Sequence, residues 1–384
     1  MNSSRPVERR GIRIVRRTAV LTASLAVAGA LGAVPASAAT GTAATSADAT
    51  AGANGRVSAI VRVGSRVFIG GNFTTVGGLP RRGLAALNAD TGAVDPGWSA
   101  DVAGEVLALA GSPSATTLYV GGTFTSVRGV SRANVAAVST TTGVPTSWDP
   151  RTNSSVMALT ASSSQVLLGG KFTQIGGLYL GRLAMVDPTN GSPNRYFAPR
   201  PDSWVASLQL ARTGTAVYAG GNFTRIGGQY RAHLASVSLA NGAASTWYPD
   251  ASSCPVFGAV LSPDGTRLFV ACAGSSNSVA SYNTAANGPR VWGAMGDGNV
   301  QAVTLVGTTV YAGGHFLRMN GADRRKLAAF DYTTGAMAPW APSLDSPLGV
   351  WALCPSTNGV WAGGDFTTVN GRSQPHIALF RQVA

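Results

Sequence analysis

The chain has 384 residues, of which 45% are hydrophobic and 12% charged, and its formal net charge at pH 7 is +13. Only Lys171 and Lys326 are lysines, and after the N-terminal segment the arginines are scattered. Because dense basic runs interleaved with aromatic residues are missing, this composition argues against nucleic-acid binding. The scattered charge is typical of a solvated surface and is also compatible with attraction to anionic envelope polymers or acidic glycans.

Residues 1–38 have the parts of a signal peptide. Six arginines accompany an apolar run at residues 19–34, and Ala36-Ser37-Ala38 has the small-x-small form of a cleavage site. We expect general secretory export with cleavage after this triplet, and twin-arginine export is the alternative. Cleavage removes six arginines and one glutamate, which lowers the formal charge from +13 to +8. Residues 39–55 predict a flexible lead-in, and no later run is long enough for a transmembrane helix.

A Gly-Gly-x-Phe motif returns along the mature chain. Successive glycine pairs are 51, 48, 51, 93 and 50 residues apart, and the long interval contains a diverged copy at Ala271-Cys272. Seven copies of a roughly 50-residue unit are typical of repeated supersecondary structures that bury their apolar faces against one another. The pairs are Gly70-Gly71, Gly121-Gly122, Gly169-Gly170, Gly220-Gly221, Gly313-Gly314 and Gly363-Gly364, followed by Phe73, Phe124, Phe172, Phe223, Phe316 and Phe366.

Each unit predicts four short strands and no helix. In the second copy the strands cover residues 106–110, 117–125 and 134–138 and the region of Trp148, separated by turn residues. We therefore predict an all-β fold, a single seven-bladed β-propeller of four-stranded repeats over residues 56–384. The glycine pairs would let neighbouring backbones approach closely. The aromatic residues of the fourth strands are expected in the core: Trp98, Trp148, Tyr196, Trp247, Trp292 and Trp340.

Two units depart from the pattern. The last unit ends after its third strand, so either residues 45–53 supply its outer strand or the blade has three strands. Since the composition of that segment is poor for a strand, we expect a weak or absent fourth strand. The fifth unit lacks the Gly-Gly loop that follows the second strand elsewhere. We expect a lower rim there, with any asymmetric binding site beside it.

The repeats resemble a known family of secreted bacterial proteins. The sixth unit shows the pattern in the segments Val310-Tyr311-Ala312-Gly313-Gly314-His315-Phe316, Leu327-Ala328-Ala329-Phe330-Asp331, Thr334-Gly335 and Trp340-Ala341-Pro342. It is similar to the delta-60 repeat (DUF5122-like) type of β-propeller, and its Gly-Gly strand and later Trp are similar to the kelch repeat pattern. The resemblance implies a secreted or envelope-associated propeller, and it implies little about activity because such residues are structural.

One polar position inside the motif varies while its neighbours do not. The residue between Gly-Gly and Phe either faces solvent or contributes to a shared pocket, and in the second case it gives ligand-binding candidates at Asn72, Lys171, Asn222, His315 and Asp365. His315 and Asp365 are also the best candidates for a catalytic acid–base pair. The other two occupants of this position are Thr123 and Ala273.

Four arginines recur in the loop between the second and third strands: Arg81, Arg132, Arg231 and Arg324. Aspartates recur just before the next unit, at Asp101, Asp149, Asp202, Asp250, Asp297 and Asp345. Propeller topology places both sets on one face, so we expect Arg–Asp pairs there. The pairs are either inter-blade contacts or a charged ring in which the arginines bind an anionic ligand.

The cysteines and histidines predict a disulfide rather than a metal site. In an exported chain, Cys254 and Cys272 would meet across the hairpin of the fifth unit, leaving Cys354 free and buried. The alternative is three reduced cysteines that act as small hydrophobic residues. Metal-ligand spacings, nucleophile elbows and nucleotide-binding motifs are missing from the sequence. We therefore expect no metal and no cofactor.

Two classes of function remain. We favour a secreted or wall-associated binding scaffold that is not an enzyme, because few carboxylates and histidines are free of structural roles. Its partner would be an anionic glycan, a wall polymer or an envelope protein, with no nucleic acid, and we expect a monomer. The alternative is an extracellular polysaccharide-active hydrolase or lyase with its site at the mouth of the propeller channel.

Overall fold

The computed structural model describes residues 44–249, 251, 253–274, 276–285 and 287–382. Within these ranges every regular element is a β-strand, which confirms the all-β prediction for this part of the chain. The predicted signal peptide and the first residues of the lead-in lie outside the described residues. No helix in the described part of the chain is long and apolar enough to cross a membrane.

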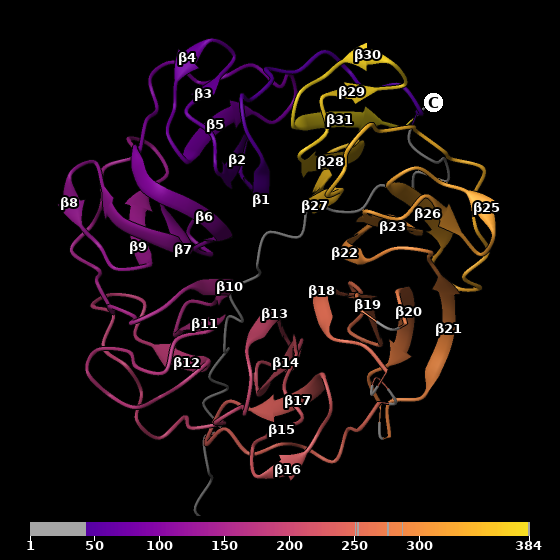
Figure 1. Cartoon of the computed structure of the whole chain (residues 1–384). Coiled ribbons are helices and arrows are strands. Elements are labelled where there is room, and N and C mark those ends of the chain that lie inside the picture. Colours follow the sequence, from indigo (N-terminus) through magenta and orange to yellow (C-terminus); the bar gives the residue numbers. More distant parts are fainter. Residues whose placement is uncertain (1–43, 250, 252, 275, 286, 383–384) are drawn as a thin grey trace, which may run out of the picture.

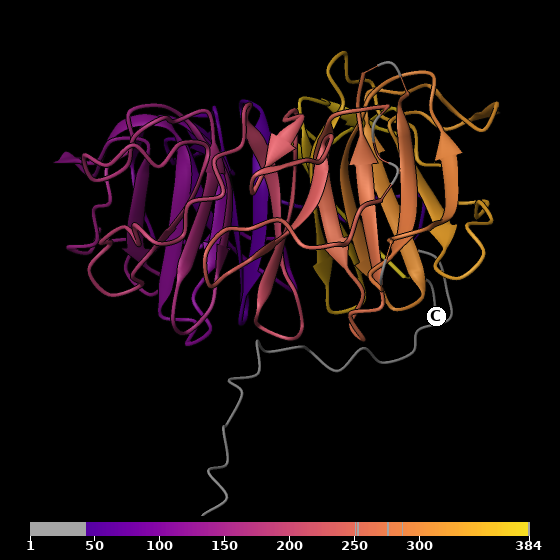
Figure 2. The ribbon, with the colours of Figure 1, turned by 90° about the horizontal axis from the view of Figure 1, so that it is seen from below.

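The strands form seven main antiparallel sheets, numbered one to seven in chain order, which surround a common centre (Figure 1). Seen from the side, the sheets stand upright next to one another in a disc (Figure 2). The first strands, nearest the centre, are β1 (Val57–Val63), β6 (Val102–Gly111), β10 (Val156–Ala161), β13 (Val205–Leu210), β18 (Val256–Leu261), β22 (Val300–Val306) and β27 (Val350–Ser356). The second are β2 (Arg66–Gly71), β7 (Thr117–Val127), β11 (Val166–Gly170), β14 (Ala216–Gly221), β19 (Arg267–Cys272), β23 (Thr309–Gly314) and β28 (Gly359–Gly364). The third are β5 (Leu84–Asn88), β9 (Val135–Ser139), β12 (Leu183–Val186), β17 (Leu234–Ser238), β20 (Ser278–Asn283), β26 (Leu327–Asp331) and β31 (Ile377–Arg381).

The predicted fourth strand is regular only in sheet five, where β21 (Arg290–Met295) pairs with β20. In five other sheets a single bridge stands in its place: Leu87 with Val94, Val138 with Pro145, Val186 with Pro193, Val237 with Ala244 and Phe330 with Met337. The prediction of four-stranded repeats is therefore wrong for most units. Proline at or beside two of these bridges removes a backbone donor, which limits continuation of the ladder.

Small hairpins follow the second strands and define one face of the disc, called the hairpin face below. They are absent from sheet five, as expected from its sequence, since β19 passes to β20 directly. Sheet two extends β7 to pair with β8 (Val130–Ser131), and sheet three has a bridge between Ile175 and Leu178. The other hairpins are β3 (Thr75–Val76) with β4 (Leu79–Pro80), β15 (Arg225–Ile226) with β16 (Gln229–Tyr230), β24 (Arg318–Met319) with β25 (Ala322–Asp323) and β29 (Thr368–Val369) with β30 (Arg372–Ser373).

Residues 44–53, called the N-terminal strap below, lie along the outer side of sheet seven. The Asp48 N–H donates to the Leu379 carbonyl at 2.8 Å, and these residues form an antiparallel bridge. The Trp340 indole donates to the Ala44 carbonyl at 2.9 Å. The expectation of a weak or absent fourth strand in sheet seven is met in its weak form, because a single bridge stands in place of a paired strand. The assignment of residues 39–55 as a flexible lead-in stays a prediction. Backbone and side-chain hydrogen bonds hold the strap in place.

The glycine pairs allow neighbouring sheets to approach, as predicted. A Cβ atom added to the first glycine of each pair would lie 2.3–2.8 Å from a Cγ1 atom of the valine that begins the next sheet. At Gly363 that valine is Val57 of sheet one, so the same contact joins the last sheet to the first. The last sheet and the first are therefore in contact through side chains of the repeat itself, in addition to the strap.

Sheet five reaches the same spacing by exchanging two residues. Elsewhere the first glycine faces an alanine or serine on the first strand, as Gly363 faces Ala352. In sheet five Ala271 faces Gly258, so the alanine is on the second strand and the glycine is on the first. Because one position of the pair always lacks a Cβ, the inner two strands keep their close contact with the next sheet.

Replacing Gly363 by alanine should destabilise the protein by about 1–3 kcal/mol, because the new methyl group would overlap Val57. Adding Ala352→Gly, which reproduces the arrangement of Ala271 and Gly258, should recover part of this loss. Urea unfolding measures both effects. Gly97→Ala is the matched control, since its nearest contact is 3.5 Å away. Equal midpoints for Gly363→Ala and this control would contradict the close approach at the seam.

Large aromatic side chains fill the spaces between sheets. The motif phenylalanines and Trp98, Trp148, Trp247, Trp292 and Trp340 are buried, as predicted. The prediction fails at Tyr196, which is 77% exposed, while its neighbour Phe197 is fully buried. The Asn194 N–H donates to the Met185 carbonyl, as the Thr146 N–H donates to the Ala137 carbonyl in sheet two, so Asn194 and Thr146 are equivalent. This unit has one more residue than sheet two between that position and the buried aromatic residue. The core position is therefore the third residue after Asn194.

Candidate functional site: the central cavity

All seven first strands carry a β-bulge at the same place. The register skips the residue directly after the valine that packs on the preceding glycine pair, so this residue has no partner on the second strand. Bulges re-aim side chains. Because the first strands lie nearest the centre (Figure 1), the seven bulged side chains meet near the axis. They are Ser58, Leu107, Met157, Ala206, Phe257, Gln301 and Trp351.

These side chains line a cavity of about 130 Å³ on the axis. Arg56 and Glu105 complete its lining and precede the bulge by two residues, so they lie at its mouth on the hairpin face. Next to the mouth, the ring centroids of Trp204 and Phe257 are 5.2 Å apart. The wall is apolar from Leu107 round to Phe257, and the polar groups gather on the remaining side. The sevenfold backbone therefore carries an asymmetric set of side chains.

A polar network crosses the junction of sheets seven, one and two. Arg56 Nη2 lies 2.5 Å from Glu105 Oε1, and the Arg56 Nε–H donates to Ser58 Oγ at 3.2 Å. Ser58 in turn donates to Glu105 Oε1 at 3.3 Å. The Arg56 guanidinium also lies over the Trp351 ring, 5.2 Å from its centroid. The two charges neutralise one another, so the mouth has no net charge from this pair.

Two residues of the cavity lining each carry a buried side-chain atom without a hydrogen-bond partner, namely Gln301 Oε1 and Trp351 Nε1. Gln301 is 8% exposed, the least of the seven bulged residues. An unsatisfied buried polar group costs about 1–3 kcal/mol, and native proteins keep few of them. An acceptor and a donor without partners in one cavity are what a ligand site presents before its ligand binds.

The variable polar residues of the motif surround the mouth without lining the cavity. Their backbone N–H groups donate to the residue that precedes the valine: Asn72 to Arg56 at 2.9 Å, Lys171 to Ser155 at 3.0 Å and Asn222 to Trp204 at 3.0 Å. Asn72 and Lys171 are exposed, and Asn222 is half-buried. Their role in ligand binding stays a prediction. In sheet five the corresponding Ala273 is buried.

His315 and Asp365 occupy the same ring position, but no hydrogen bond or ion pair joins these two described residues. Asp365 accepts a hydrogen bond from the Ser346 hydroxyl, and Ser346 also receives the Gly349 N–H. The His315 carbonyl accepts from Lys326 Nζ at 3.2 Å. The partners of Asp365 are thus structural, and the geometry offers no support for a catalytic pair.

The predicted Arg–Asp pairs do not form among the described residues. Each of the four arginines instead donates to backbone carbonyls of its own unit, as Arg132 does to Thr146 at 2.6 Å and Arg324 to Ala338 at 2.9 Å. Arg81 and Arg231 do the same to Pro96 and Ser245. The arginines therefore fasten the fourth-strand segment to the hairpin. Their proposed contact with an anionic ligand stays a prediction.

Three of the recurring aspartates, Asp202, Asp297 and Asp345, cap hairpins, whereas Asp149 forms an ion pair with Arg151 at 2.7 Å. Asp345 accepts from the Thr367 and Thr368 N–H groups and from the Thr367 hydroxyl, at 2.6–2.9 Å. Burial alone would raise the pKa of Asp345, but these hydrogen bonds outweigh it and lower the pKa to about 2. Asp202 and Asp297 make the same backbone bonds. Asp250 lies outside the described residues.

Sequence reasoning missed the bulged residues, although a signal was present. Each first strand has a valine at the same place, at positions 57, 106, 156, 205, 256, 300 and 350, and the following residue differs in every copy. A constant core residue beside a variable one indicates a constant frame around a site. Glu105, the one glutamate after residue 38, likewise has no place in the repeat pattern. The expectation of an asymmetric binding site beside sheet five stays a prediction, and Phe257 of that sheet lines the central cavity.

In the part of the chain that the structure describes, no group of three or more His, Cys, Asp or Glu residues is arranged to hold a metal ion. The cavity offers one carboxylate, which Arg56 already holds. The other lining residues offer groups for stacking and hydrogen bonding.

No protein-family model matches the chain, and no curated protein matches it in sequence. Solved structures are similar in fold. The WD40 β-propeller domain of Doa1 matches with a TM-score of 0.62 and 12% identity, covering 88% of this chain and 96% of that domain. The β-propeller domain of Myceliophteria thermophila Cps50 (Swd1) matches with a TM-score of 0.59 and 13% identity, covering 86% and 97%. These similarities show a β-propeller fold.

Proposed function

We propose that this chain is an exported, closed seven-bladed β-propeller of the delta-60 type that acts as a binding scaffold, with its ligand in the central cavity. The ligand belongs to a glycan, a wall polymer or an envelope protein. The observation that carries the proposal is the set of seven bulged residues, which present seven different side chains at one height around the axis. A purely structural bulge would not require this variety. The predicted signal peptide and the Cys254–Cys272 disulfide support export.

The composition of the cavity favours binding over hydrolysis. Most glycoside hydrolases use two carboxyl groups that flank the scissile bond. Here Glu105 is the only carboxylate in the wall, and it is paired with Arg56. The hydrolase or lyase alternative would need a second acid or base, and His315 and Asp365 are engaged in no catalytic contact. We therefore retain the scaffold as the function that the site supports best.

Filling the cavity tests this proposal. Ala206→Phe should abolish binding of any cavity ligand, and the fold should tolerate the ring because the equivalent residue of sheet five is already Phe257. Binding of glycans, wall polymers and peptides would be measured for the mature protein at low and high salt. Ala240→Phe, on an exposed turn of the same sheet, is the matched control. A ligand whose affinity is unchanged by Ala206→Phe uses another surface and contradicts the proposal.

A further inference from the structure

We infer that the central cavity binds one uncharged sugar residue in its pyranose form, presented at the end of a glycan. This inference rests on the proposed function and names the ligand class of that site. A pyranose has an apolar face of C–H groups and a rim of hydroxyls that both donate and accept hydrogen bonds. The residues that line the cavity carry both kinds of group, namely an aromatic ring at Phe257 and buried polar atoms without partners at Gln301 and Trp351.

The apolar part of the wall provides a surface for the C–H face of the sugar. Phe257 contributes an aromatic ring, and Met157 and Leu107 continue the apolar wall. Aromatic side chains combine a large apolar area with few rotatable bonds, so they order a ligand at little entropic cost. Trp204 lies against Phe257 and holds that ring from the side of the mouth.

The polar groups match hydroxyls better than any charged group. Gln301 Oε1 is an acceptor without a partner, and Trp351 Nε1 is a donor without one. The Gln301 amide can rotate to offer its NH₂ group instead, so it can meet either side of a hydroxyl. Once both side chains turn these buried atoms toward the cavity, a sugar hydroxyl placed between them would satisfy both, which removes the cost of leaving them unpaired.

Charged ligands are disfavoured because the wall already contains its own ion pair. A cation would compete with Arg56, which holds Glu105 at 2.5 Å and occupies the face of Trp351. An anion attracted to Arg56 would have to approach Glu105 as well, and like charges in a partly desolvated site repel. Only an uncharged ligand leaves this pair intact.

The cavity volume sets the size of the ligand. A cavity of roughly 150 Å³ accommodates benzene, and the volume here is about 130 Å³. One sugar ring, seated partly within the cavity and partly at its open mouth, is the largest unit that this space accepts. The remainder of a glycan would extend over the hairpin face, where Asn72, Lys171 and Asn222 surround the mouth.

The Arg56–Glu105 pair also has a structural role, since it joins sheets one and two beside the seam. That role does not require Gln301 or Trp351 to lack partners, because neither residue hydrogen bonds to the pair. Gln301 is therefore the residue at which ligand binding and stability can be separated. Replacing its amide by an apolar group of similar size should remove the hydrogen bond to ligand and also the unpaired buried polar atoms.

Calorimetric titration of the mature protein provides the test. The probes are methyl pyranosides and short oligosaccharides without charge, compared with a methyl uronoside, a methyl aminoglycoside and arginine-containing peptides. At least one uncharged sugar should bind with an affinity that does not change between low and high salt. Gln301→Leu should weaken that binding by about tenfold or more, with an unfolding midpoint equal to or above that of wild type. Gln209→Leu, outside the cavity wall, should leave binding unchanged.

The outcomes separate this inference from the proposed function. A charged probe that binds and is excluded by Ala206→Phe would overturn the sugar inference while leaving the cavity as a binding site. Sugar binding that is insensitive to both Gln301→Leu and Ala206→Phe would place the sugar elsewhere and also overturn it. If no probe of any class shows binding that depends on Ala206, both the inference and the proposed function fail.

Discussion

A mature chain that begins at residue 54 should be less stable than the full mature chain by several kcal/mol. The truncation removes the N-terminal strap, whose hydrogen bonds contribute roughly 0.5–1.5 kcal/mol each. They include Trp340 Nε1 to Ala44, Asn370 Nδ2 to Thr45 at 2.9 Å and Gln374 Nε2 to Thr50 at 2.7 Å. The truncation also leaves the Trp340 indole N–H without its partner and exposes the edge of β31.

Denaturant unfolding of both chains measures the loss, and a peptide added in trans provides the control. A synthetic peptide of residues 43–54 should bind the truncated chain by strand addition and raise its midpoint with the logarithm of peptide concentration once the peptide exceeds its Kd. A peptide of the same composition in scrambled order should have no effect. Equal stability of the two chains, or equal effects of the two peptides, would show that the strap does not complete sheet seven.

The strap illustrates which part of the fold could be predicted from the sequence. The glycine pairs and the phenylalanines determine contacts within each unit and with its neighbour, so their period alone predicts the repeated sheets. Residues 44–53 have no strand-forming composition. Their position depends on hydrogen bonds to backbone carbonyls of β31 and on the Trp340 indole. Pairing that depends on backbone groups of a distant segment leaves little trace in local side-chain pattern.

The candidate site was harder to predict for a similar reason. Polar residues attract attention in a sequence, yet the arginines bind backbone carbonyls and Asp345 caps a hairpin. The cavity depends instead on a bulge, which turns one residue of each first strand toward the axis. Residues such as Met157 and Ala206 have no sequence feature of a ligand site. Only closure of the ring places them beside Gln301 and Trp351.

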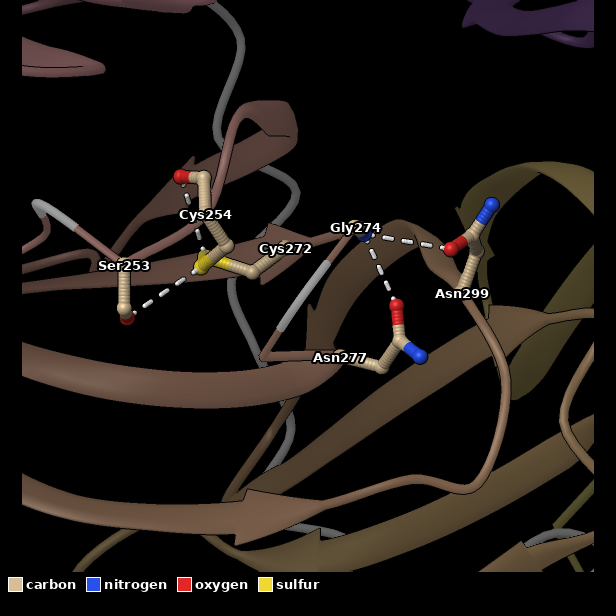
Figure 3. Close-up of a disulfide and its surroundings, with 6 residues drawn as sticks. All are labelled: Ser253, Cys254, Cys272, Gly274, Asn277 and Asn299. Atoms are coloured by element: carbon tan, nitrogen blue, oxygen red, sulfur yellow. Dashed lines mark hydrogen bonds between the residues drawn. A yellow bond between two sulfur atoms is a disulfide. The ribbon is translucent and has the colours of Figure 1, made fainter.

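Replacing Cys254 and Cys272 together by alanine should destabilise the protein by about 3 kcal/mol, because their disulfide closes a loop of 18 residues in sequence. Their Cα atoms are 5.5 Å apart, within the usual range for disulfides. Sheet five lacks both the second glycine and the hairpin at the place where this bond lies. Beside the bond, the Gly274 N–H donates to the side-chain oxygens of Asn277 and Asn299 (Figure 3). It also anchors the start of β18, which carries Phe257 into the cavity.

Reductant separates loss of the disulfide from loss of side-chain volume. Unfolding of the wild-type protein should shift to lower denaturant when a thiol reductant is present, whereas the double variant should show no shift. Cys354→Ala serves as a control, since that thiol is free and burial raises its pKa to about 12. Its unfolding should respond to reductant as strongly as that of wild type. Mass spectrometry under non-reducing conditions that finds Cys272 as a free thiol would contradict the bond directly.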